Sequence, residues 1–425
     1  MLFSSLFAKT AEYEKLAHAL SAPGACALFG LPGSGRAMVY AALAKETGRF
    51  LCIVTPGEAE ATRFAGDLNA LGIPTAVFPA RDYVLRPIEG TAREYEYRRL
   101  SVLGDIVGGR LQAVCVPDEG LTQYTTPRAE FCNNTRTLHP GDTVPRTELT
   151  ALLYNAGYAR RAQVDGPGQF SIRGDIVDLY APDMKLPVRM EFWGDEIDTM
   201  HTFDLATQRR EDPIEKIYVS PAREVLFGSP AEAAELLRAF IKKFRGKKRT
   251  ALEACLATEL AQLDGGALPV NMDKYLAVRY PQPATLLDYF DDPLLVLEEP
   301  ASLREAERAT TYRRGEEISA LLQDGVLAAG LDNLYAENGY LWAQAANHRT
   351  ICAENFARSM PDIPLKDIVN APAHTLPAWG GEVTSLLEDL QPLCNGGAAV
   401  TVLAGTQRAA AGLAADLRTK GLLVT

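Results

Sequence analysis

The sequence predicts an α/β protein with a parallel sheet, a small antiparallel β-rich domain inserted in it, and the start of a further α/β domain. Three observations support this. Strand-like apolar runs alternate with helical patterns over the first 130 residues, period-two alternation appears between residues 169 and 203, and a second α/β pattern follows residue 366. The predicted domains are 1–145 and 216–365 for the two parts of the main domain, 146–215 for the insertion, and 366–425 for the last.

Composition sets broad limits on the class of protein. The chain has 425 residues, 47% hydrophobic and 23% charged, which indicates two to four ordinary folded domains and excludes wholesale disorder. No apolar run reaches the roughly 18 residues of a membrane helix, and residues 1–9 lack the basic start of a secretory signal. The net charge of −11 argues against a general nucleic-acid-binding surface but not against a local basic site.

The cysteines and histidines point away from metal and nucleophile chemistry. The seven cysteines are scattered and form no CxxC pair, which is typical of reduced, buried thiols in a cytoplasmic protein. The five histidines are dispersed as well. Neither a zinc site nor a histidine-based catalytic triad is therefore predicted.

The first part of the chain alternates strands and helices. We expect strands at residues 26–29, 50–54, 76–79 and 111–116. We expect helices at residues 38–46, 59–71 and 98–107, each between two strands or after one. Such alternation is the signature of a parallel sheet.

The turn after the first strand resembles a phosphate-binding loop. That loop, GxxxxGK[ST], surrounds phosphates with backbone N–H groups, contacts them with its lysine and holds Mg²⁺ with its hydroxyl. The glycines and the following helix make the domain P-loop-like and helicase-like. Arginine, however, replaces the lysine, and alanine replaces the hydroxyl residue. The loop residues are Gly30, Gly33, Gly35, Arg36 and Ala37. We predict a degenerate loop that keeps anion-binding geometry and lacks the groups for hydrolysis, with weak nucleotide binding or an active ATPase as alternatives.

Two acids follow the fourth predicted strand. Asp118 and Glu119 could be taken for an acidic Mg²⁺ motif. Because Ala37 has no hydroxyl to share the ion, we interpret them as acids at the start of a helix, where the helix dipole favours them.

A β-rich module begins near residue 157. Phe170, Ile172 and Ile176 alternate with polar residues, and so do Val188, Met190 and Phe192 after a turn at 182–183, with a third strand expected at 196–203. This pattern is typical of an antiparallel sheet with one buried face. The open face would carry Arg173, Arg189, Glu191 and Trp193, with Arg160 from the incoming segment.

The charge of the module bears on what the open face could bind. Residues 156–215 hold 12 acids and 7 bases, whereas a nucleic-acid footprint should be basic. Arginines beside an acid and a tryptophan are typical of protein recognition. A solvated sheet face with cross-strand charge pairs remains the alternative.

Three blocks in this module resemble a known family. Residues 169–180 (QFSIRGDIVDLY), 187–197 (PVRMEFWGDEI) and 203–209 (FDLATQR) are similar to segments shared by UvrB and the bacterial transcription-repair-coupling factors, the Mfd family. A weaker resemblance to the first domain of that family runs through 51–71 and 77–103, and residues 286–297 resemble its return to the first sheet. The resemblance implies a UvrB-like shell interrupted by the β module.

Two departures favour the transcription-repair-coupling factors over UvrB. The family's damage-verifying members have an intact phosphate loop and a long, tyrosine-rich hairpin, whereas Arg36 and Ala37 break the first and residues 81–99 are too short for the second. The chain is therefore similar to the N-terminal region of a coupling factor. The resemblance implies that the module docks onto UvrA as UvrB does, with contacts from Arg160, Arg173, Arg189, Glu191 and Phe192, although alternation points Phe192 inward.

The resemblance also implies a role. The chain would recruit UvrA to stalled RNA polymerase in transcription-coupled nucleotide excision repair, with no cofactor and no ATP hydrolysis of its own. RNA polymerase binding, DNA binding and an ATP- and Mg²⁺-dependent DNA-translocating motor would lie in downstream domains. No membrane is involved. The alternative is a UvrB-like, ATP-dependent damage-binding or helicase-like enzyme.

A basic run follows an amphipathic helix predicted at 230–243. Residues 242–249 (KKFRGKKR) contain six cations, which could contact a DNA backbone. The alternative is a solvated helix end whose cations suit the C-terminal dipole. Few aromatic residues are interleaved with the charges, which favours the alternative.

The last part of the chain begins with helices and a linker. A helix is expected at 302–322, and a proline-bearing stretch near residue 371 predicts a linker. Helices at 382–390 and 407–419 and strands at 398–404 and 422–425 would form a single βαβ opening. Because one such unit is not a complete domain, we expect the chain to belong to a longer protein.

Overall fold

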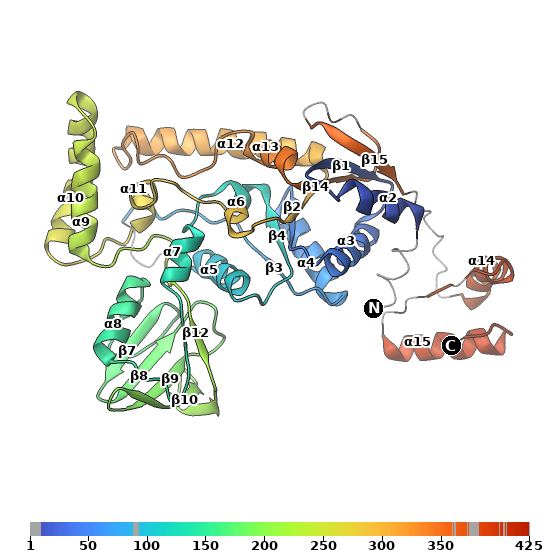
Figure 1. Cartoon of the computed structure of the whole chain (residues 1–425), viewed down its shortest axis with the longest axis horizontal. Helices are drawn as coiled ribbons and strands as arrows, with labels where there is room; N and C mark the ends of the chain where they lie inside the picture. The colour runs from blue at the N-terminus through green and yellow to red at the C-terminus, as the bar shows by residue number, and fades with distance from the viewer. Residues whose placement is uncertain are drawn as a thin grey trace. The chain divides into compact units, whose positions relative to one another are not determined.

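The structure is a computed structural model that describes residues 10–87, 93–358, 360, 363–371, 373, 382–398, 400–402, 404 and 406–424. The chain divides into two compact units, Met1–Pro372 and Ala373–Thr425 (Figure 1). The predicted absence of a secretory signal at residues 1–9 concerns positions outside the described ones. Among the helices described, none is long and apolar enough to span a membrane.

A seven-stranded sheet organises the first unit, and every strand pair in it is parallel. Its strand order is β15 (Leu365–Asn370), β1 (Gly24–Phe29), β14 (Arg349–Glu354), β13 (Leu294–Glu298), β2 (Leu51–Thr55), β4 (Ala113–Pro117) and β3 (Thr75–Val77). The predicted α/β class with a parallel sheet is confirmed. The sheet combines strands from before and after the β module, and β1 lies between two later strands, so neither part of the chain completes it alone.

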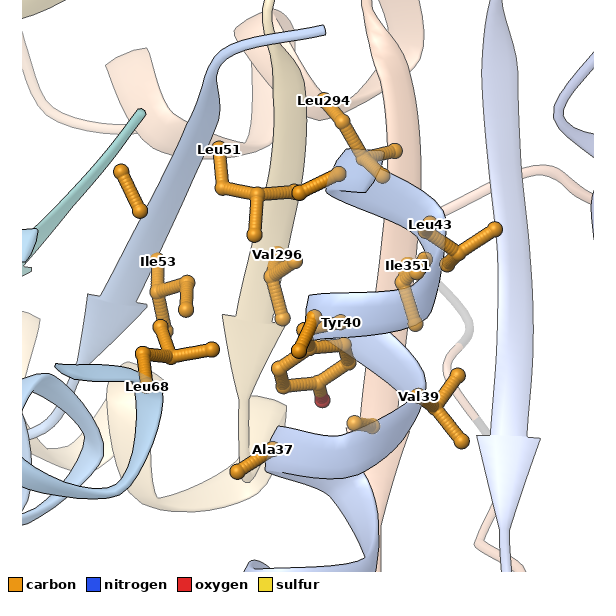
Figure 2. Close-up of a cluster of buried hydrophobic side chains, with 14 of the residues drawn as sticks. Ala37, Val39, Tyr40, Leu43, Leu51, Ile53, Leu68, Leu294, Val296 and Ile351 are labelled. Carbon is orange, nitrogen blue, oxygen red and sulfur yellow. The ribbon is translucent and has the colours of Figure 1, made fainter. Parts of the chain in front are cut away.

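Helices cover both faces of this sheet, as expected for strands buried on both sides. One face packs against α2 (Ala11–Ala19), α3 (Gly33–Thr47) and α4 (Glu58–Ala70). Figure 2 shows this layer, in which Tyr40 and Leu43 of α3 lie against Val296 and Ile351 of the central strands. The other face carries α5 (Glu94–Val107), α6 (Asp118–Thr122), α7 (Arg128–Asn133), η2 (Leu286–Tyr289), α12 (Pro300–Gln323) and α13 (Tyr340–Asn347).

The β module is a six-stranded sheet with α8 (Arg146–Asn155) beside it (Figure 1). The strand order is β11 (Arg210–Pro213), β10 (Glu196–Phe203), β9 (Val188–Trp193), β8 (Ile176–Tyr180), β7 (Gln169–Arg173) and β6 (Ala159–Arg160). All pairs are antiparallel except β6 with β7. A two-stranded sheet of β5 (Arg136–Leu138) and β12 (Ile217–Val219) adds Leu138 and Val219 to the same core, which therefore extends beyond 146–215 on both sides.

One predicted orientation in this module is wrong. The alternation of the sequence predicted that Ile176 lies on the buried face. In the structure, Ile176 pairs directly with Arg173 across a two-residue turn, and Val177 and Leu179 are buried instead. Gly174, at the turn, has φ 60°, a conformation that favours glycine. The tight turn sets a register that a simple alternation through residues 170–176 does not follow.

A helical segment follows the module. It comprises α9 (Pro230–Lys242), α10 (Gly246–Asp264), η1 (Met272–Tyr275) and α11 (Leu276–Arg279). Helices α9 and α10 lie side by side (Figure 1), with Leu237 and Ile241 of α9 and Leu252 and Leu256 of α10 in one buried cluster. This hairpin presents residues 243–245 at its turn.

The second unit contains α14 (Val383–Asn395) and α15 (Gln407–Thr419), close to the predicted helices. The strands predicted at 398–404 and 422–425 include positions outside the described ones, and the described positions in both ranges are not assigned as strand. The boundary predicted at residue 366 falls within β15, which pairs with β1, so this segment belongs to the first unit's sheet.

All seven cysteines are free thiols. The expected burial holds for Cys26, Cys52, Cys115 and Cys352, which lie in central strands. It is wrong for Cys132 and Cys394, which lie near the ends of helices at exposed positions.

Candidate functional site

The face of the β module that points away from its core carries a row of charged side chains. In β9, Val188, Met190 and Phe192 are buried, which places Arg189 and Glu191 on the opposite face. Cross-strand register continues this outer face to Asp178 of β8, which pairs with Arg189, and to Thr199 of β10, which pairs with Glu191. The predicted open face thus exists, and it includes an acid that the sequence analysis did not select.

Asp178 holds two of the predicted arginines. Its side chain is fully buried, and Arg189 donates from Nε to Oδ1 at 2.7 Å and from Nη2 to Oδ2 at 2.9 Å. Arg173 donates from Nη2 to the same Oδ2 at 2.5 Å. One carboxylate therefore fixes both guanidinium groups, and the hydrogen bond to Asp178 raises the pKa of Arg189.

The two arginines differ in what else they contact. Arg189 keeps only 13% of its side chain exposed, donates from Nη1 to the Gln208 carbonyl at 3.2 Å, and lies 4.7 Å over the Phe203 ring. Arg173 keeps 45% of its side chain exposed and has Asp178 as its ion-pair partner among the described residues. Arg173 is thus held in place from one side and open to a partner on the other.

Glu191 and Trp193 extend the outer face along β9. Glu191 forms an ion pair with Arg210 of β11, and Thr199 donates from Oγ1 to its Oε2 at 3.4 Å. Trp193 is 84% exposed at the end of β9, an unusual position for a large aromatic side chain. The structure therefore brings Arg173, Arg189 and Glu191 together in one row, with an exposed tryptophan at its end.

Two of the predicted contact residues lie elsewhere. Phe192 is 5% exposed and packs in the module core, as its alternation indicates, so it supports the face from beneath. Arg160 is exposed on the edge strand β6, in register with the inward-facing Phe170. It lies at the rim of the sheet and not among the arginines held by Asp178.

Of the loop residues, Gly30 lies between β1 and α3 at the carboxyl edge of the parallel sheet. Gly33, Gly35, Arg36 and Ala37 already belong to α3, which begins earlier than the helix predicted at 38–46. Arg36 does not face the loop, because its guanidinium is buried among the ends of β13 and β14. It donates from Nη1 to Glu298 at 2.5 Å and to the Ala353 carbonyl at 3.2 Å, and from Nη2 to Glu299 at 2.7 Å and Asn355 at 3.1 Å. The arginine in the lysine position is thus occupied by protein groups.

Other protein groups lie close to the glycines of the loop. A Cβ atom on Gly33 would lie 3.2 Å from a guanidinium nitrogen of Arg63, so this cation lies over the start of α3. A Cβ on Gly30, whose φ is 90°, would lie 2.8 Å from the Ala371 carbonyl oxygen, and one on Gly35 would lie 3.4 Å from Pro32. Ala37 is fully buried and offers no ligand atom (Figure 2). The loop therefore has neither the lysine amine nor the hydroxyl that contact phosphate and hold Mg²⁺ in an intact phosphate-binding loop.

Two buried carboxyl groups lie at the same edge of the sheet. Burial raises the pKa of Glu298 to about 7, against the opposing effect of Arg36, and Tyr40 donates to it at 2.5 Å. Burial also raises the pKa of Asp118 to about 7. Asp118 begins α6 and Glu119 forms an ion pair with Arg313, so the prediction of acids at a helix start is confirmed. Within the described ranges, no group of three or more His, Cys, Asp and Glu residues could hold a metal ion.

Comparison with known proteins identifies the module. Residues 137–225 match the UvrB interaction domain family. The predicted resemblance is confirmed. The match covers every strand of the six-stranded sheet, all of β12, and β5 except Arg136, so the outer face described above lies within the matching segment.

Most of the chain, the module included, is also similar to curated proteins. It is 26% identical over 375 residues to the transcription-repair-coupling factor of Bacillus subtilis, covering 86% of this chain and 32% of that protein. It is 23% identical over 391 residues to the transcription-repair-coupling factor of Staphylococcus epidermidis, covering 89% of this chain and 33% of that protein. The chain spans about a third of the length of these relatives.

Proposed function

We propose that this chain is the UvrA-recruiting part of a transcription-repair-coupling factor, and that the outer face of its UvrB interaction domain is the docking surface. The observation that carries the proposal is the arginine pair fixed by Asp178 on that face. A buried acid that orients two arginines lowers the entropy lost when they bind a partner.

The alternative of a merely solvated sheet face explains less of this surface. In a solvated cross-strand charge pair, both side chains are usually exposed. Here the Asp178 side chain is fully buried, while 45% of the Arg173 side chain remains exposed. Trp193 adds a large apolar contact at the end of the same row. Arginine and tryptophan are the residues that most often carry the energy of protein interfaces.

Replacing Arg173 with alanine tests the assignment. We expect the Arg173→Ala chain to bind purified UvrA at least tenfold more weakly in a calorimetric titration, because an interface arginine typically contributes 1.4 kcal/mol or more (roughly tenfold). Its circular dichroism and unfolding midpoint should stay close to those of the native chain, since Arg189 retains its own two bonds to Asp178.

Arg136→Ala is a matched control. Arg136 lies in the same domain with 36% of its side chain exposed and is paired with Glu148, but it lies on β5, outside the six-stranded sheet. We expect this variant to bind UvrA like the native chain. Unchanged affinity in Arg173→Ala, or equal weakening in both variants, would refute the docking face.

We also propose that the glycine-rich loop does not bind or hydrolyse Mg²⁺-ATP, because Arg36 is occupied by Glu298 and Glu299 and Ala37 has no hydroxyl. Titration with Mg²⁺-ATP, followed by phosphate release, tests this separately from UvrA binding. Tight binding with turnover would favour the UvrB-like enzyme instead. In this proposal, RNA polymerase binding and an ATP- and Mg²⁺-dependent DNA motor belong to the two thirds of the relatives' length that this chain does not cover.

A further inference from the structure

We propose that the turn of the α9–α10 hairpin binds the phosphate backbone of duplex DNA. The surface consists of six cations, here called the basic tip: Lys242, Lys243, Arg245, Lys247, Lys248 and Arg249. All six are exposed, and they stand on a chain whose net charge is −11. The basic tip uses none of the residues of the UvrA-docking face, and the proposal does not rest on that function.

The basic tip lacks the neutralising partners that the chain supplies elsewhere. Among the described residues, only Arg249 of this group forms an ion pair, with Glu253 at 2.8 Å. Lys243 lies 5.9 Å from the Phe240 ring centre, a weak contact at an exposed site. Five positive charges are therefore left to solvent within a short stretch of chain, and a polyanion would be attracted to them.

The direction of α10 increases this preference. Lys247, Lys248 and Arg249 lie in its first turn, which contains no acid, and the N-cap residue Arg245 makes no side-chain capping bond. The partial positive charge of a helix N-terminus disfavours cations, so this arrangement is unfavourable until an anion binds. The expectation that the cations suit a C-terminal dipole is right for Lys242, in the last turn of α9, and wrong for these three.

The apolar side chains of the turn face inward, and this decides between possible partners. A Cβ on Gly330 would lie 2.8 Å from the Phe244 ring and 3.1 Å from the Phe240 ring, so both rings pack against the backbone there. Both rings are partly buried against the helical core, so neither projects from the turn to anchor a protein, stack on single-stranded bases or enter a membrane surface. Contact with backbone phosphates requires only cations, and it is independent of base sequence.

The test is fluorescence anisotropy of a labelled 20-base-pair duplex over a series of salt concentrations. The variant carries alanine at Lys243, Lys247 and Lys248, and alanine favours the helix at the last two positions. We expect it to bind at least tenfold more weakly at 50 mM salt, and to flatten the slope of log affinity against log salt by about two to three, because each phosphate contact contributes about 0.9.

The matched control carries alanine at Lys45, Lys216 and Lys420, which are exposed and lie outside the basic tip. It has the same net charge, and we expect it to keep the native affinity and salt slope. Equal weakening in both variants, or no duplex binding by the native chain at 50 mM salt, would overturn the proposal. So would binding to anionic phospholipid vesicles or to polyglutamate in preference to the duplex. Because the basic-tip variant should still bind UvrA, failure of either proposal can be recognised separately.

Discussion

The carboxylate of Asp178 should determine both the stability of the β module and its proposed docking surface. We consider the change Asp178→Ala. In the native chain this fully buried group accepts two hydrogen bonds from Arg189 and one from Arg173. Its removal leaves a guanidinium that is only 13% exposed without its counter-ion.

The expected cost follows from these exposures. Removing one partner of a buried ion pair destabilises a protein by about 3–5 kcal/mol. Arg173 can turn to solvent, and Arg189 keeps its bond to the Gln208 carbonyl and its contact with Phe203, so part of the cost is recovered. We therefore expect a loss of about 2–3 kcal/mol, together with UvrA binding at least as weak as that of Arg173→Ala.

Hydrogen exchange measured by mass spectrometry is the suitable assay, because the chain contains several cores and one global unfolding energy would hide a local effect. Amides of β7, β8 and β9 should lose protection by the stated free energy, while those of β1 and β13 should not change. A loss below about 0.5 kcal/mol at β8 and β9, or an equal loss in both sheets, would refute this account of the carboxylate.

Two further predictions concern the edge of the parallel sheet. Arg36→Ala should destabilise the first unit by about 3 kcal/mol in urea unfolding at pH 8, because it leaves buried Glu298 without its cation. A free energy of unfolding within about 0.5 kcal/mol of the native value would contradict a stabilising role for Arg36. The pKa of Asp118 is about 7 in the folded chain, against an ordinary value of 3.8. The native state therefore binds this proton more tightly than the unfolded state does. The free energy of unfolding should fall as the pH rises from about 4 to 7 and then level off. In Asp118→Asn the loss of urea midpoint between pH 5 and pH 8 should be smaller, with a residual loss from Glu298, and an unchanged pH profile would contradict the assignment.

The fold class followed from the sequence because local patterns determine local elements. Apolar runs such as Leu51–Thr55 form strands wherever the sheet places them. The strand order is different, since β1 lies between β14 and β15, which are more than 300 residues later in the chain. Which distant strands become neighbours depends on how the crossover helices pack, and no pattern within one strand contains that information.

The outer face of the β module was only partly predictable for a related reason. Alternation found Arg189 and Glu191 because both lie in one regular strand with a clearly apolar inner face. Asp178 was missed because it stands between Val177 and Leu179 in an apolar run, which suggests a core position. The turn after Arg173 pairs Asp178 with Ser171 of β7, and the connection between β8 and β9 pairs it with Arg189. A register of this kind depends on turn geometry more than on composition.

Two glycines of the degenerate loop, Gly30 and Gly33, can be explained without a nucleotide. Gly30 is required by its φ of 90° and by the Ala371 carbonyl, and Gly33 leaves room for the Arg63 guanidinium. Arginine at position 36 is long and planar enough to reach Glu298, Glu299 and the Ala353 carbonyl together, which the single ammonium of a lysine could not do with the same geometry. A side chain that joins α3 to the ends of two neighbouring strands braces the sheet. The retained shape of a phosphate loop is therefore consistent with a structural role, in which the sheet supports the β module inserted into it.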